Sequence, residues 1–329
     1  MRGRGLSPEF MTALKSGILS PILKAVQTDK DFILEIREDY INIYYKGGSI
    51  LKLKHKKNKN EYSPTFDENY AKNNPKHTKE VRKRLAINKI TTRDEAEEWA
   101  NNIRFFKGIM DYDSSTSEKK KLEKSSQQMI VQENNFTKKS STTKKWESTD
   151  YFIIDFEYQC RAFQYQGKGK SVRSRFDLVG LIWDIKDRNK PKDCRLAIIE
   201  VKYGDESLQG KSGLIDHLIK AEKFLDDKKR EENFKKEMVT IFKQKRELGI
   251  LNVDNPHEVT IDTIANKIDF LIIIAGHDPG ENSVLMNELT KMKPEIKKAN
   301  VQFATSSFAG YALFKENIKD FQEFMKLLK

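Results

Sequence analysis

Two carboxylates and a lysine lie within apolar, strand-like runs near the middle of the chain. In the run 196–202, the alternation of side chains along a strand places Glu200 and Lys202 on one face. Asp177 interrupts a second apolar run, 176–182. Because a charge is costly to bury without a partner or a task, we expect these three side chains to converge on one polar site.

The residue types of this trio suggest hydrolysis of a phosphodiester bond. Carboxylates and a main-chain carbonyl are the oxygen ligands that Mg²⁺ prefers, so we expect Asp177, Glu200 and the carbonyl of Val201 to hold Mg²⁺, with Mn²⁺ as a substitute. Lys202 would orient or deprotonate the attacking water and offset negative charge in the transition state. The alternative is a structural ion pair at an exposed strand end, with Asp177 in a turn.

Other polar residues near the trio are secondary candidates. Gln209 precedes a predicted helix and is either a phosphate-contacting catalytic residue or a helix cap. Asp155 and Glu157 share one strand face, and we favour an ordinary edge-facing alternation over an extension of the acidic site. A basic segment is expected either to grip a phosphate backbone or to form a solvated hairpin, and its residues are Lys168, Lys170, Arg173 and Arg175.

Three further patterns are not favoured as functional sites. The run 204–212 ends in Gly-Lys-Ser and resembles a P-loop, but it has one residue too many between its glycines to cradle phosphate in the usual way. His217 and His277 have no partner at metal-ligand spacing and are not assigned to a site. The tyrosines Tyr40, Tyr44 and Tyr45 are expected to pack across strands rather than to stack on bases.

The surrounding elements indicate a mixed α/β protein. Apolar strand patterns at 151–163, 175–185 and 194–203 are followed by a helical region at 214–248 and a buried strand at 270–275. A further strand is expected near 301–314 and a closing helix at 318–328. This order predicts a central mixed sheet flanked by helices.

The N-terminal part has a different pattern. Residues 1–10 precede a second methionine and are interpreted as a vector-derived tag, so they are excluded from the fold prediction. Residues 32–54 predict a β-meander, and the polar stretch 55–74 predicts a loop. Thr92 and Glu95 form a capping-box pattern before a buried helical stripe. We therefore expect an N-terminal region at 11–112 and a second domain at 113–329.

Composition limits the classes of function. The formal net charge of +12 suits a polyanionic partner. Cys160 and Cys194 lack the spacing of a zinc site or a disulfide framework, and no run is long enough to span a membrane. The chain is expected to be a cytoplasmic protein that does not bind membranes.

Residues 122–275 resemble the core of the PD-(D/E)XK nuclease superfamily, which has the restriction-endonuclease-like fold. The motif RFDLVG is similar to the second-strand aspartate motif, although Phe176 stands where the proline usually precedes Asp177, and IIEVK is similar to the third-strand motif. The stretch SSQQMIVQENN resembles the first helix of this superfamily, which implies that Glu133 reaches the metal or its waters.

The resemblance implies a Mg²⁺-dependent endonuclease that acts on nucleic acid, with DNA favoured over RNA. By analogy, such proteins serve bacterial antiviral defence or restriction, and the N-terminal region would supply recognition, regulation or dimerisation. Cutting of both strands would favour a homodimer, and a regulatory partner protein is left open. The alternatives are a non-cutting module that binds nucleic acid or protein and, as a weaker one, a P-loop-like nucleotide hydrolase.

Overall fold

The computed structural model divides into two compact units. It describes residues 3–116, 122–135, 138–139, 146–147, 149–160, 174–184, 194–251, 264–265, 267–276, 283–305 and 318–327. Unit 1 comprises Met1–Gln128 and Thr240–Asn252, and unit 2 comprises Met129–Val239 and Val253–Lys329. The division falls inside helices α5 (Leu122–Asn135) and α7 (Lys228–Glu247), rather than between residues 112 and 113.

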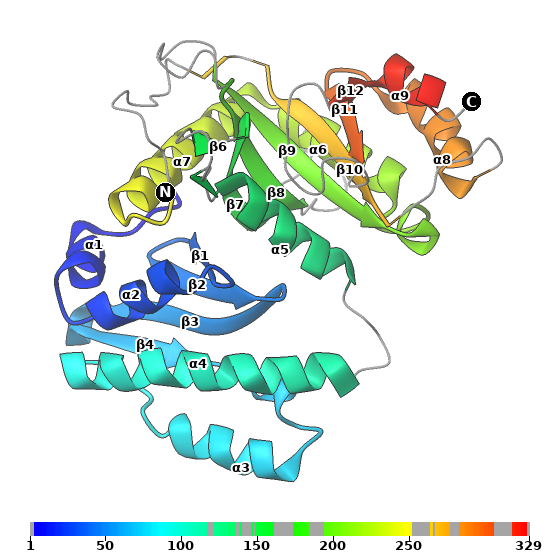
Figure 1. Ribbon diagram of the computed structural model, residues 1–329. Helices are drawn as coiled ribbons and strands as arrows, with labels where there is room; N and C mark the ends of the chain where they lie inside the picture. Colours follow the sequence, from blue (N-terminus) through cyan, green and yellow to red (C-terminus); the bar gives the residue numbers. More distant parts are fainter. Residues whose placement is uncertain are drawn as a thin grey trace. The chain divides into compact units, whose positions relative to one another are not determined.

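A four-stranded antiparallel sheet forms the centre of unit 1 (Figure 1). Its strands, in spatial order, are β1 (Ile33–Ile36), β2 (Tyr40–Tyr45), β3 (Gly48–Lys56) and β4 (Glu61–Thr65). The first three confirm the predicted meander. The prediction of a loop at 55–74 is wrong, since this stretch holds β4 and two short 3-10 helices, η1 (Lys57–Lys59) and η2 (Glu68–Tyr70). Tyr62 and Pro64 point into the core, and β4 tolerates a proline because it is an edge strand.

Four helices accompany this sheet: α1 (Pro8–Lys15), α2 (Ser20–Thr28), α3 (Pro75–Arg84) and α4 (Arg93–Thr116). On α4 the expected stripe is fully buried at Ala96, Trp99, Ile103 and Phe106. The described residues of the segment 1–10, which is interpreted as a tag, are part of unit 1. Phe10 is completely buried, and its ring lies 5.0 Å from that of Tyr62.

The capping box at the start of α4 has the expected reciprocal hydrogen bonds. The amide of Glu95 donates to Thr92 Oγ1 at 3.3 Å, and Glu95 Oε2 accepts from the amides of Thr91 and Thr92 at 2.6 and 3.0 Å. The Thr91 amide is the main cause of the lowered pKa of the Glu95 carboxyl. This bonding therefore stabilises the fold above the ordinary pKa of glutamate and is lost as the pH falls.

Replacing Thr92 by alanine is expected to destabilise unit 1 by about 1 kcal/mol, because an orphan amide at the start of α4 loses its acceptor. Urea denaturation of the full chain measures the change. The Thr92→Ser variant keeps the hydroxyl and should unfold like the wild type. Equal losses in both variants would show that the methyl group, rather than the cap, is what matters.

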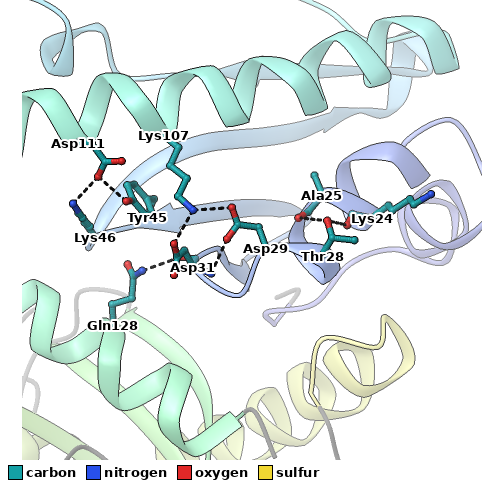
Figure 2. Close-up of polar contacts among 10 residues, drawn as sticks. All are labelled: Lys24, Ala25, Thr28, Asp29, Asp31, Tyr45, Lys46, Lys107, Asp111 and Gln128. Atoms are coloured by element: carbon teal, nitrogen blue, oxygen red, sulfur yellow. Dashed lines mark hydrogen bonds and ion pairs between the residues drawn. The ribbon is translucent and has the colours of Figure 1, made fainter. Parts of the chain in front are cut away.

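Polar side chains join α4 to β2 and to the turn before β1 (Figure 2). Lys107 Nζ on α4 donates to Asp29 Oδ2 at 2.8 Å and to Asp31 Oδ2 at 2.7 Å. The hydroxyl of Tyr45 donates to Asp111 Oδ1 at 2.6 Å. The pKa of this phenol is raised, mainly because the side chain is partly buried and in addition because of the contact with Asp111. The half-buried network fixes the long helix on the sheet.

The second half of α7 belongs to unit 1 through a buried ion pair. Lys245 Nζ donates to Glu35 Oε1 on β1 at 2.8 Å, and the two side chains are 3% and 0% exposed. Removing one partner of such a pair strands a buried charge. This contact explains why 240–252 groups with the N-terminal sheet.

A six-stranded mixed sheet forms the centre of unit 2, in the order β12-β11-β10-β9-β8-β7. The strands β7 (Tyr151–Gln159), β8 (Arg175–Ile182) and β9 (Arg195–Tyr203) form an antiparallel meander. The strands β10 (Asp269–Ala275) and β11 (Asn300–Thr305) run parallel to β9, and β12 (Lys319–Asp320) is antiparallel at the edge. A separate two-stranded ladder joins β5 (Lys138–Lys139) and β6 (Trp146–Glu147).

Helices lie on both sides of this sheet. Figure 1 shows α5 across its near side and α6 (Leu214–Leu225) on its far side. The remaining helices are α8 (Val284–Met292), η7 (Lys293–Glu295) and α9 (Phe321–Leu327). The expectation of a mixed α/β protein with a central mixed sheet is confirmed. Cys160 and Cys194 are free and buried, and no described helix is both long and apolar enough to cross a membrane.

Candidate active site

Asp177 and Glu200 occupy opposed positions on neighbouring strands. The β8–β9 register pairs Leu178 with Ile199, and its continuation places Asp177 opposite Glu200. These two residues are only 6% and 1% exposed. Asp177 Oδ2 accepts the amide proton of Val201 at 2.9 Å, so the carboxylate extends the hydrogen bonding between the strands. The expected convergence of the two acids is therefore present in the structure.

Lys202 completes the buried group. Its Nζ donates to Glu200 Oε1 at 2.7 Å and to the carbonyl oxygen of Ser212 at 2.8 Å, and the residue is 3% exposed. Ser212 has a φ of 74°, which turns the loop before α6 back towards the strand. The alternative of an exposed ion pair with Asp177 in a turn does not describe this arrangement, because Asp177 lies within β8 and the whole trio is buried.

His217 is a member of the site that the sequence reading left out. Its Nδ1 on α6 lies 3.0 Å from Glu200 Oε2, and the side chain is 14% exposed. Burial, with a contribution from the charge of Lys202, lowers the pKa of His217 to about 4. The imidazole is therefore neutral at neutral pH, and its Nδ1 is a close polar neighbour of Glu200 Oε2 rather than its hydrogen-bond donor.

A third carboxyl group lies on the same face of the sheet. Asp155 on β7 is fully buried and pairs with Val179, whose side chain shares a face with Asp177. The expectation of an edge-facing polar alternation is therefore wrong for Asp155. Glu157, two positions further, has a φ of 55° and lies 3.6 Å from Arg175 Nη2. A register shift between Ile153 and Asp155 accompanies this departure from regular pairing.

The other candidates are more peripheral. Arg175 begins β8, and its side chain is 57% exposed beside Glu157. Gln209 is exposed in the turn after η5 (Asp205–Ser207), and Glu133 is exposed on α5. Their proposed roles stay predictions. Lys168, Lys170 and Arg173 of the basic segment, together with His277, lie outside the described residues.

In the loop that resembles a P-loop, a main-chain amide is already bound by the carboxylate of Asp216. The amide of Ser212 donates to Asp216 Oδ2 at 3.0 Å, and Lys220 Nζ donates to the same oxygen at 2.7 Å. The pKa of Asp216 is lowered overall by these contacts against the opposing effect of burial. A phosphate cradled here would have to displace a carboxylate from this amide, which disfavours nucleotide binding at this loop.

The charges and donor atoms of the site fit a hard divalent cation. Three carboxyl groups, of Asp155, Asp177 and Glu200, share this face of the sheet with the single ammonium of Lys202. Within the described ranges, no group of three or more His, Cys, Asp or Glu side chains has metal-binding geometry. An ion held by Asp177 and Glu200 would complete its shell with water and substrate oxygens, as Mg²⁺ commonly does.

The tyrosines of β2 confirm the packing interpretation. Tyr44 and Tyr45 are 6% and 4% exposed, so they belong to the core. Tyr40 is half-buried, and the ammonium groups of Lys52 and Lys54 lie 4.8 and 5.9 Å from its ring centroid. These lysines occupy the ring that a base would need for stacking.

Comparisons with known proteins give no family name. The chain matches no protein-family model, no curated protein and no solved structure.

Proposed function

We propose that this protein is a metal-dependent endonuclease of the PD-(D/E)XK type that hydrolyses phosphodiester bonds in nucleic acid, with DNA favoured. One observation carries the proposal: Asp177 and Glu200 face each other across β8 and β9 while the buried ammonium of Lys202 contacts Glu200. A buried carboxylate pair with one lysine suits metal-assisted phosphoryl chemistry. The order α5, β7, β8, β9, α6, β10 supports the restriction-endonuclease-like core that the motifs imply.

The site residues divide the work between holding the ion and stabilising charge. Asp177, Glu200 and the carbonyl of Val201 would hold Mg²⁺ or Mn²⁺, with Glu133 as a candidate for its waters. The bound ion would polarise the scissile phosphate and increase the acidity of a coordinated water. Lys202 orients the attacking water and offsets negative charge on the phosphate, because its ammonium is fixed between Glu200 and Ser212.

His217 positions Glu200 in this proposal, since its Nδ1 lies 3.0 Å from the carboxylate oxygen that Lys202 does not contact. The His217→Ala variant is expected to need about 10- to 100-fold more Mg²⁺ for half-maximal cleavage. Cleavage rates measured across a Mg²⁺ titration test this. His217→Asn places an amide nitrogen near the position of Nδ1 and should recover much of the loss. If the alanine and wild-type titrations coincide, His217 does not position the ligand.

Incubation of the full chain with supercoiled plasmid tests the activity itself. We expect nicking or linearisation with Mg²⁺ or Mn²⁺ and none with EDTA. A parallel incubation with short RNA decides between the two nucleic acids. Metal-dependent cutting that persists in both Glu200→Gln and Asp177→Asn would show that the cutting site lies elsewhere. Binding of DNA without any cutting would favour a non-cutting module on the same fold.

A further inference from the structure

The helix α3 and its flanks carry a strongly positive net charge. Residues 72–89 hold seven basic residues and one acidic residue, so their formal charge is 7 − 1 = +6, against +12 for the whole protein. Half of the excess charge therefore lies in one short segment of unit 1. Such a concentration attracts a polyanion at long range.

The N-terminus of α3 is well capped, but the helix contributes little to the core. Asn74 Oδ1 accepts from the amides of Lys76 and His77 at 3.0 and 3.3 Å, and Pro75 occupies the first turn. Only Val81 is buried among the residues of α3, which packs on α4 and η2 (Figure 1). Most of the surface of α3 is therefore not needed for packing.

Lysines cluster on the outer face of α3. At 3.6 residues per turn, Lys76, Lys79 and Lys83 fall within an arc of about 60°, nearly opposite the buried Val81. All three are exposed, as are Lys72 before the helix and Lys89 after it. The stripe from Lys76 to Lys83 rises about 10 Å, which corresponds to about three base-pair steps of duplex DNA.

The three lysines of this stripe have no carboxylate partner among the residues that the structure describes. Within the part of the chain that the structure describes, Lys76, Lys79 and Lys83 form no ion pair, even with Glu80 on the same helix. Several other surface lysines lie 2.6–3.0 Å from a carboxylate, namely Lys15, Lys56, Lys57, Lys220 and Lys236. The stripe therefore offers charge that the protein itself does not neutralise.

We propose that the outer face of α3, formed by Lys76, Lys79 and Lys83 with Lys72 and Lys89, binds the phosphate backbone of duplex nucleic acid. Lysine ammonium groups are point charges that suit regularly spaced phosphates and release their counterions. A membrane surface fits less well, because an interfacial helix needs a broad apolar face and the buried side chain of α3 packs within the protein. The inference adds a substrate-binding surface to the proposed nuclease, and it holds whether or not the protein cuts.

Salt-dependent binding tests the surface without cleavage. The full chain is mixed with a fluorescein-labelled 25-base-pair DNA duplex in EDTA, and anisotropy gives Kd between about 50 and 300 mM salt. We expect the triple variant Lys76→Gln, Lys79→Gln, Lys83→Gln to bind on the order of 100-fold more weakly at 0.15 M salt. The slope of log K against log salt should fall by about 2.7, or about 0.9 for each lost phosphate contact.

Two matched variants separate a binding surface from net charge and from misfolding. Lys228→Gln, Lys229→Gln, Lys236→Gln removes the same charge from the exposed face of α7 and should bind nearly as the wild type does. The triple variant Lys76→Arg, Lys79→Arg, Lys83→Arg keeps the charge and should preserve binding. Equal weakening by the α7 variant, failure of the arginine variant to bind, or wild-type binding to phosphatidylserine vesicles but not to the duplex would each overturn the proposal.

The result is independent of the active-site experiment. Duplex binding through α3 without metal-dependent cutting would support this surface and remove the nuclease proposal. If the triple variant cuts plasmid and binds the duplex like the wild type, the nuclease proposal is supported and the binding surface on α3 is removed.

Discussion

Replacing Lys202 by methionine is expected to lower metal-dependent cleavage by about 10³-fold while DNA binding in EDTA is retained. Methionine preserves the length of the side chain but removes the charge that contacts Glu200 Oε1 and the Ser212 carbonyl. Single-turnover cleavage with saturating protein measures the chemical step separately from binding. The loss should persist at high Mg²⁺, because it concerns the charge on the reacting phosphate.

This substitution also affects folding, which must be measured beside activity. Removing one partner of a buried pair costs about 3 kcal/mol or more, so the cleavage assay belongs well below the melting temperature of the variant. Lys211→Met is the matched control, because it removes an exposed lysine from the loop after the same strand. Cleavage by Lys202→Met within about threefold of wild type would leave Lys202 with a structural role only. Loss of an ATPase activity in Lys211→Met would instead favour the P-loop reading.

Replacing Glu222 by alanine is expected to destabilise unit 2 by about 3–4 kcal/mol. Its Oε1 on α6 accepts the amides of Lys297, Lys298 and Ala299 at 2.9–3.0 Å, and Oε2 also accepts from Lys298 at 3.0 Å. These three successive amides lead into β11, and Ala299 is buried. Without the carboxylate, all three amides lose a charged acceptor, and the amide of Ala299 loses it in a buried position.

Hydrogen exchange provides a local measurement of this effect. Amides 297–299 should exchange much faster in Glu222→Ala, and the thermal transition assigned to unit 2 should fall by roughly 10 °C. Glu222→Gln keeps one acceptor oxygen and should lose less. Glu206→Ala removes an exposed carboxylate of the same unit and should leave both readouts unchanged. Unaltered exchange at 297–299 in the alanine variant would show that Glu222 does not hold this segment.

The core of the site could be predicted because strand alternation is a local property. Glu200 and Lys202 share a face wherever that segment forms a strand, and an acid in the apolar run around Asp177 signals a partner nearby. Helix α4 could be predicted for a similar reason, since the Thr92–Glu95 capping box and the apolar spacing after it lie within a few turns of one another.

The departures arose where contacts depend on residues far apart in the chain. Asp155 was expected to alternate at an edge, but a register shift in β7 and the pairing with β8 bury it beside the acids. His217 lies at helical spacing from the buried residues Leu214, Leu218 and Ala221 of α6. Its partner Glu200 could not be inferred, because the placement of α6 over the strand end is a tertiary property.

The sequence by itself determined the alternation of strands and helices, the convergence expected of Asp177, Glu200 and Lys202, and the excess of positive charge. These follow from period, composition and the cost of buried charge, which act over short distances. Only the tertiary structure decided which groups complete the site and which segments enter the fold. Pairing register brought Asp155 to the acidic face, packing of α6 brought His217 to Glu200, and burial of Phe10 made the N-terminal segment part of unit 1. Those outcomes depend on long-range contacts, whose free energy exists only once distant parts of the chain have come together.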